Sequence, residues 1–169
     1  MTLRHWNTAI RLILREEGEK VVNEPGLGVI DSTVQKTHEW IDAVSENGHL
    51  SKAEAYKALR AVLQTLRDRL PVDDAAHFSA QLPMLIRGLF FDGWRPADVP
   101  VKFSREEFLK AISAKMVSSH FIDPLRITQE VFGVIAEQIS RGESAKVRQI
   151  LPKDLQSLWP EPQVEPFEE

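Results

Sequence analysis

The second half of this 169-residue chain repeats the first half at a fixed spacing. A shift of 69 positions aligns eleven pairs of similar residues, most of them apolar. Within each copy the apolar positions follow helical spacing, so each copy predicts a set of helices. The aligned pairs are Val62/Val131, Leu63/Phe132, Leu66/Ile135, Leu70/Ile139, Ala76/Ala145, Phe78/Val147, Leu82/Leu151, Pro83/Pro152, Ile86/Leu155, Leu89/Leu158 and Phe90/Trp159.

The repeat divides the chain into repeat one (31–92), a connector (93–103) and repeat two (104–159). Each repeat predicts two long helices, a short helix, a Leu-Pro corner and a last short helix. No segment alternates apolar and polar residues as a strand does, so we expect an all-α protein. Two repeats are too few for an open solenoid. The sequence therefore predicts a closed helical bundle of two tandem four-helix repeats, related by a pseudo-twofold axis.

Helix boundaries follow from short local signals. Ser51 with Glu54, and Ser104 with Glu107, have the spacing of capping boxes. Three other N-caps and one C-cap are expected: Asp31 or Ser32, Asp73, Asp123 before Pro124, and Gly142. The apolar positions shared by the repeats predict a buried core that includes Leu63, Leu66, Leu82, Phe132, Ile135 and Leu151.

The two ends of the chain differ from the repeats. Residues 1–25 form a predicted N-terminal amphipathic extension in which Leu3, Trp6, Ile10 and Ile13 share one helical face. This face predicts a helix that docks on its own domain, or a loose extension; membrane-surface binding is the alternative. Residues 161–169 are an acidic, proline-rich tail, expected to be extended and solvated.

Composition excludes several classes of function. The net charge of −4 argues against a nucleic-acid partner held by electrostatics, because such proteins carry a basic surface. The absence of cysteine excludes disulfides, thiolate metal sites and cysteine nucleophiles. No apolar run approaches the 18 residues typical of a membrane span. We expect a cytoplasmic protein.

Residues typical of catalysis are scattered. His38-Glu39 does not continue into a zinc-protease motif, because position 42 is aspartate. Asp73, Asp74 and His77 could share a metal on one helical turn, but acids at a helix start are the commoner arrangement. Adjacent Ser118, Ser119 and His120 do not define a nucleophile and its base. The sequence predicts no catalytic residue, no metal site and no cofactor, and it favours a protein that is not an enzyme.

Residues 87–96 include residues that the shorter end of repeat two does not match. Gly88 lies inside a predicted helix, where glycine is unfavourable, so we expect a close packing contact there. Arg87 and Arg95 are expected either to pair with Asp92 or to hold an anion beside Trp94. The alternative is a helix end with a tryptophan that covers the connector.

Several motifs together resemble the DUF2267 family, which groups small bacterial, all-helical proteins of unknown function. They are residues 34–40 (VQKTHEW), 56–63 (YKALRAVL), 66–71 (LRDRLP), 80–88 (AQLPMLIRG), 92–94 (DGW), 151–155 (LPKDL) and 158–160 (LWP). The resemblance covers about residues 26–160 and leaves residues 1–24 outside. It implies an all-helical fold and a bacterial cytoplasmic setting, but no activity.

Two functions remain open at this point. The first is a non-catalytic helical protein that binds a protein partner or a second copy of itself. The second is an anion-binding protein or an enzyme, with a site at the repeat interface near Arg87, Trp94 and Arg95. A flat apolar patch would favour the first function, and a deep polar pocket would favour the second.

Overall fold

The computed structural model describes residues 27–117 and 121–161, and within them every regular element is a helix. The predicted N-terminal helix and most of the acidic tail lie outside the described residues. The chain divides into two units, residues 1–32 and 33–169, with the boundary inside the first helix. The helices are α2 (Leu27–Gly48), α3 (Lys52–Arg69), α4 (Val72–Ser79), α5 (Met84–Phe91), the short 3₁₀ helix η2 (Pro96–Asp98), α6 (Arg105–Lys115), α7 (Pro124–Gln138), α8 (Arg141–Ile150) and α9 (Lys153–Gln156).

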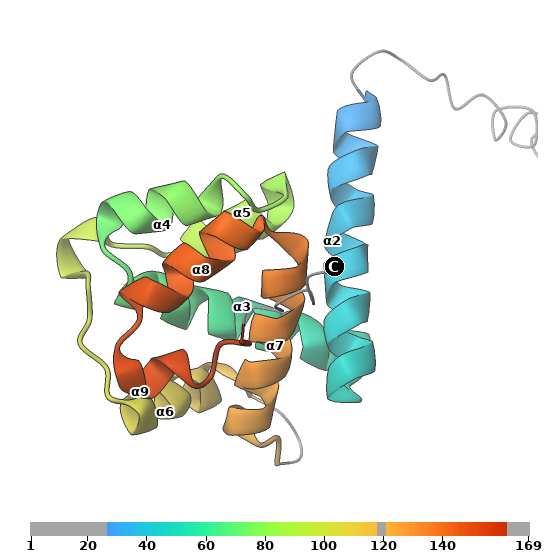
Figure 1. The fold of residues 1–169 in the computed structure, drawn as a ribbon. Helices are drawn as coiled ribbons and strands as arrows, with labels where there is room; N and C mark the ends of the chain where they lie inside the picture. The colour runs from blue at the N-terminus through green and yellow to red at the C-terminus, as the bar shows by residue number, and fades with distance from the viewer. Residues whose placement is uncertain (1–26, 118–120, 162–169) are drawn as a thin grey trace, which may run out of the picture. The chain divides into compact units, whose positions relative to one another are not determined.

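The second unit is organised around α3, ten of whose eighteen residues are buried. Helix α3 packs against α5, α6 and α7, and α6 also packs against α7. In Figure 1, α3 passes through the middle of the unit, with α4 and α5 on one side and α6 and α9 on the other. A single apolar cluster connects all of these helices, and it contains every residue predicted for the core. Leu63, Leu66, Phe132 and Ile135 are fully buried there, and Leu82 and Leu151 are nearly so.

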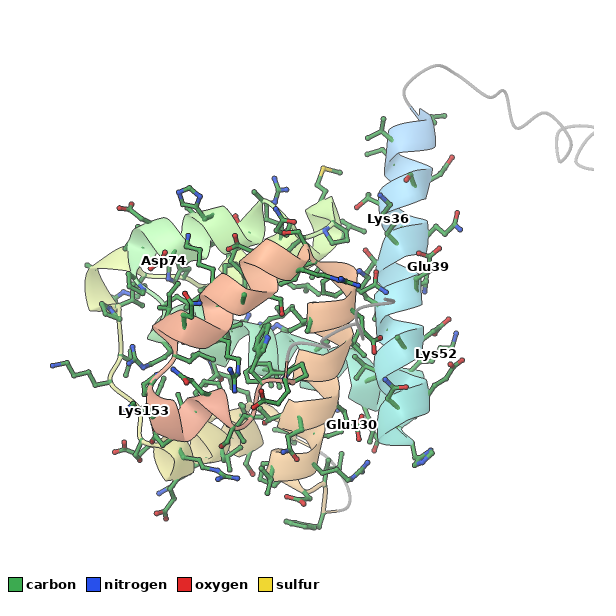
Figure 2. The ribbon with its side chains drawn as sticks, in the orientation of Figure 1. Lys36, Glu39, Lys52, Asp74, Glu130 and Lys153 are labelled. Atoms are coloured by element: carbon green, nitrogen blue, oxygen red, sulfur yellow. The ribbon has the colours of Figure 1, made fainter. Side chains whose placement is uncertain are left out.

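Charged side chains are distributed over the outside of this unit. Figure 2 labels Lys36 and Glu39 on α2, Glu130 on α7 and Lys153 on α9, all directed away from the ribbons. Some of these surface charges connect helices, as in the pair between Asp74 on α4 and Lys146 on α8, at 3.1 Å. Exposed pairs of this kind each stabilise a fold by under about 1 kcal/mol, so the apolar cluster provides most of the stability.

Several predicted helix starts are confirmed. Both capping boxes are formed, with the serine hydroxyl accepting from the third helical amide and the glutamate accepting from the serine amide. Asp123 caps α7 by accepting from the Leu125 amide at 3.0 Å, with Pro124 at the first helical position. These side chains satisfy amides that have no partner within the helix.

Other predicted boundaries are wrong. Helix α2 already includes Leu27, so neither Asp31 nor Ser32 caps it. Pro71 occupies the N-cap of α4, which places Asp73 inside the first turn. Gly142 lies in α8 and does not end α7; Ile139 does so in extended conformation, and Ser140 then caps α8. At the start of α4 and the end of α7 the boundary falls at Pro71 and Ile139 and not at the predicted polar residue or glycine.

The corners that follow α3 and α7 have the same geometry. Leu70 after α3 has φ −80 and ψ 144, and Ile139 after α7 has φ −103 and ψ 167. Pro71 and Ser140 then occupy the N-caps of α4 and α8 with nearly equal angles. Pro83 before α5 and Pro152 before α9 also agree, at φ −53, ψ 149 and φ −56, ψ 152. Each of these positions recurs 69 residues later, which is the spacing of the aligned pairs.

Candidate functional site

The stretch that the sequence singled out begins in α5 and continues into the connector. Arg87 turns its guanidinium back to the end of α4, where it donates to the carbonyl oxygens of Ser79 at 2.8 Å, Leu82 at 3.3 Å and Ala80 at 3.4 Å. The last carbonyl groups of a helix lack partners within the helix, so a guanidinium satisfies them well. Arg87 therefore holds the α4–α5 corner together.

The predicted pairing of Arg87 and Arg95 with Asp92 is wrong. Asp92 pairs with Arg60 of α3 at 2.7 Å, and Arg95 pairs with Asp98 at 3.2 Å. Gly88 is also not a close packing contact, because a Cβ built there meets nothing within 4 Å. Helix α5 approaches its neighbours through Ile86 and Phe90, which are both fully buried, and Gly88 faces outward.

Trp94 is half-buried and belongs to the edge of the core. Its ring lies 4.9 Å from that of Phe91, which in turn contacts Phe90 at 4.9 Å. The indole Nε1 is buried and has no hydrogen-bond acceptor. Trp94 thus packs on the end of α5, and its indole N–H has no acceptor there.

Three side chains of α3 anchor the end of α5. Gln64 donates to the Leu89 carbonyl oxygen at 3.1 Å, and Arg67 donates to those of Phe90 at 2.6 Å and Asp92 at 2.9 Å. Arg67 also pairs with Asp68 at 2.7 Å, and only 5% of its surface is exposed. Together with Arg60 on Asp92, these residues form what we call the α3 clamp: Arg60, Gln64 and Arg67.

The α3 clamp does not follow from the aligned positions that agree between the two halves. Arg60, Gln64 and Arg67 are positions at which the repeats disagree, since 69 residues later the chain has Gln129, Gly133 and Ala136. A buried polar residue on an apolar helix face requires a partner, so this disagreement was the available signal.

A shallow cavity of about 280 Å³ lies beside the α3 clamp and is lined by basic groups. Burial lowers the pKa of Lys115 below its ordinary value, while Asp68 opposes this and Arg67 and Arg60 add to it. Each cation has an internal acceptor: Lys57 donates to the Val117 carbonyl, and Lys115 pairs with Asp68. Among the described residues that line this cavity, no serine, threonine or cysteine stands beside a histidine.

Residues that were weighed for metal or nucleophilic chemistry are placed as follows. Asp73 and Asp74 lie in the first turn of α4, and Asp74 pairs with Lys146 of α8. Over residues 27–117 and 121–161, no three histidine or acidic side chains gather as a metal site would require. Ser118, Ser119 and His120 lie outside the described residues.

The comparisons with known proteins address the family and leave the site open. None of the helices described here is long and apolar enough to cross a membrane. A search of the curated proteins gives no match. The model of a family described as "Uncharacterized conserved protein (DUF2267)" matches residues 37–158, which is most of the chain. The chain therefore belongs to the DUF2267 family.

Proposed function

We propose that this chain is a non-catalytic helical protein of the bacterial cytoplasm that acts by binding a second copy of itself. The observation that carries the proposal is the apolar start of α2: Leu27, Val29, Ile30 and Val34. These residues are 48%, 68%, 48% and 39% exposed, although large apolar side chains at the start of a helix normally find cover. The bacterial and cytoplasmic setting is supported by the family resemblance.

This part of α2 has no counterpart in α6. Trp40 and Val44 of α2 are buried one turn apart, as are Phe108 and Ile112 of α6, 68 residues later. Helix α6 begins at Arg105, three residues before Phe108, whereas α2 begins at Leu27, thirteen residues before Trp40. The family match also begins only at residue 37. Most of the apolar start of α2 therefore has no counterpart in α6 and lies before the residues that the family model matches.

A second copy of the same helix is a suitable partner for this surface. Leu27, Ile30 and Val34 follow the 3-4 spacing of one helical face, which favours packing against another helix. Two identical helices related by a twofold axis bury the same residues twice, and soluble homo-oligomers most often form in this way. Covering a leucine, isoleucine or valine side chain contributes about 1.5–3 kcal/mol each.

The proposal is tested by measuring the mass of the full chain in solution. We expect a dimer by sedimentation velocity for the wild type, and a monomer for the double variant Leu27→Glu/Ile30→Glu. Ser32→Glu places one glutamate on the same exposed helix without removing an apolar side chain, and it should leave the dimer intact. A wild type that stays monomeric at all concentrations contradicts self-association. Vesicle binding that the double variant loses would instead support the membrane-surface alternative.

For the fold, we propose that residues 31–92 and 104–159 are two tandem repeats related by a pseudo-twofold axis. The corners at Leu70/Ile139, Pro71/Ser140 and Pro83/Pro152 support this, because they agree in angles and are 69 residues apart. In eight of the eleven aligned pairs both residues are buried. An experimental structure tests the proposal by superposition, which would fail if the matched helices ran in different orders in space.

Anion binding near Arg87, Trp94 and Arg95 is the alternative function. The buried Nε1 of Trp94 without an acceptor favours it. The carbonyl groups that Arg87 already satisfies weigh against it. A thermal-shift screen of anionic ligands on the wild type and on Arg87→Ala/Arg95→Ala decides the matter. A ligand that stabilises both proteins equally removes this site from consideration.

A further inference from the structure

A larger cavity lies in the second half of the chain, away from the residues discussed so far. It measures about 370 Å³, within the range of small-molecule pockets. Its walls come from α7, α8 and the segment that follows α9. The apolar part of the lining consists of Gly133, Ala136, Ile139, Ala145, Trp159 and Pro160; the polar part consists of Glu137, Arg141, Ser144, Arg148 and Glu161.

The cavity exists because two large side chains are replaced by small ones. Gly133 and Ala136 of α7 stand 69 residues after Gln64 and Arg67 of α3. In the first half those two side chains extend from α3 to the carbonyl groups at the end of α5 and occupy the space beside it. Gly133 has no side chain, and a Cβ added there would meet nothing within 4 Å. The space that corresponds to the α3 clamp is thus left open beside Trp159.

One buried hydrogen-bond donor at this cavity has no acceptor. Arg148 donates from Nη2 to Glu161 Oε1 at 2.6 Å, but its Nε is buried and has no acceptor. The Ser144 hydroxyl accepts from the Trp159 indole at 3.0 Å, and its own proton remains available to donate. A guanidinium binds a carboxylate best through two parallel N–H bonds, and Glu161 uses only one of them.

The remaining lining restricts the charge and shape of a ligand. Its charges are balanced, with Glu137 and Glu161 beside Arg141 and Arg148, which favours a ligand with one negative charge over a polyanion such as a nucleotide. The walls formed by Ile139, Ala145 and Trp159 are suited to a compact apolar body. Glu161 is 82% exposed and pairs with Arg148 from the rim, so an incoming carboxylate can displace it at low cost.

We propose that this cavity binds a small monocarboxylic acid with a compact apolar body, such as an aryl or branched aliphatic acid. Arg148 receives the ligand carboxylate through Nε and Nη2, and Ser144 donates to the same group. In the absence of ligand, the Glu161 carboxylate occupies Arg148 as an internal competitor. This site is independent of the proposed self-association through α2.

The probes are benzoate, phenylacetate and isovalerate, each compared with its neutral amide, titrated into the full chain by calorimetry. We expect at least one acid to bind the wild type and its amide to bind at least about tenfold more weakly. Arg148→Gln should weaken that acid by about tenfold or more, whereas Arg105→Gln, an exposed arginine elsewhere, should not. If none of the three acids binds, or if Arg148→Gln binds equally well, the proposal is overturned.

A second pair of variants separates ligand binding from a structural role of Arg148. Glu161→Gln removes the internal competitor and should tighten acid binding several-fold, an effect that a purely structural arginine would not produce. Ala136→Leu should block binding by filling the cavity, while the protein still melts cooperatively. Unchanged affinity in both variants would place the ligand elsewhere and contradict the proposal.

Discussion

At the end of α5 three side chains of α3 hold the chain, whereas two of the three corresponding positions of α7, Gly133 and Ala136, carry small residues. The backbone corners that precede both ends agree closely, so the difference lies in the side chains. Gln64 and Arg67 are nearly buried and are bonded to carbonyl groups; Gly133 and Ala136 border a cavity. A buried cation with partners holds one end, and the larger of the two cavities lies at the other.

With the two halves as the proposed repeats, the comparison indicates how a chain can form a cavity without new secondary structure. Burying a guanidinium is unfavourable unless its donors are satisfied, and Arg67 satisfies them with two carbonyl groups and Asp68. Such a clamp stabilises the end of α5 against which it packs. Small residues in place of the clamp provide no such contacts. They leave room for a ligand beside an aromatic wall.

The largest expected loss of stability comes from core substitutions, which test whether the two halves have equivalent cores. Leu66 and Ile135 are an aligned pair, and both are fully buried. Leu66→Ala and Ile135→Ala should each lower the free energy of unfolding by about 2–5 kcal/mol, measured by urea melts. Leu85→Ala is the control, because Leu85 is 43% exposed and should lose under about 1 kcal/mol. A loss under about 0.5 kcal/mol at either core position would break the equivalence.

The α3 clamp should produce the next largest effect. Arg67→Ala removes bonds to the carbonyl oxygens of Phe90 and Asp92 and leaves them buried, which should cost about 3 kcal/mol. Gln64→Ala should cost about 1 kcal/mol, since its bonds are longer and uncharged at the donor. Equilibrium unfolding measures both variants. Equal, small losses would show that the α3 clamp does not stabilise the end of α5.

Much of this architecture could be predicted from the sequence. The 3.6-residue spacing and the repeat identified the helices and the core, because both depend on apolar residues such as Leu63 and Phe132 that recur. Capping boxes were equally predictable, since Ser104 and Glu107 act locally. The cavity could not be predicted, because it depends on what is missing at Gly133 and Ala136. The partners of Arg87 and Asp92 were also beyond reach, since they come from packing between helices.

Replacing glycines within helices should have a smaller effect on the free energy of unfolding, and one of opposite sign. Gly88 in α5 and Gly133 in α7 both lie within helices, and a Cβ at either position meets nothing within 4 Å. Gly88→Ala and Gly133→Ala should therefore each raise the free energy of unfolding by about 0.5–1 kcal/mol, through helix propensity and a less flexible unfolded chain. Gly93 is the contrasting control, because its φ of +67 disfavours alanine, and Gly93→Ala should be destabilising by about 1 kcal/mol. A destabilised Gly133→Ala would mean that α7 is packed more tightly at the cavity than described.

The smallest expected effect concerns the capping box of Ser104 and Glu107 at the start of α6. The Ser104 amide and hydroxyl hold the pKa of Glu107 below its ordinary value of 4.5. Because the folded-state pKa is lowered, Glu107 contributes stability above pH 4.5 and loses it as the pH falls through the folded-state value. Urea melts of Glu107→Gln should therefore differ from the wild type near pH 7 and converge in acid. Glu106→Gln removes a charge from the same turn but leaves both bonds of the box, and its melts should not converge in this way. A Glu107→Gln difference that stays constant with pH would mean that the carboxylate charge does not fix the start of α6.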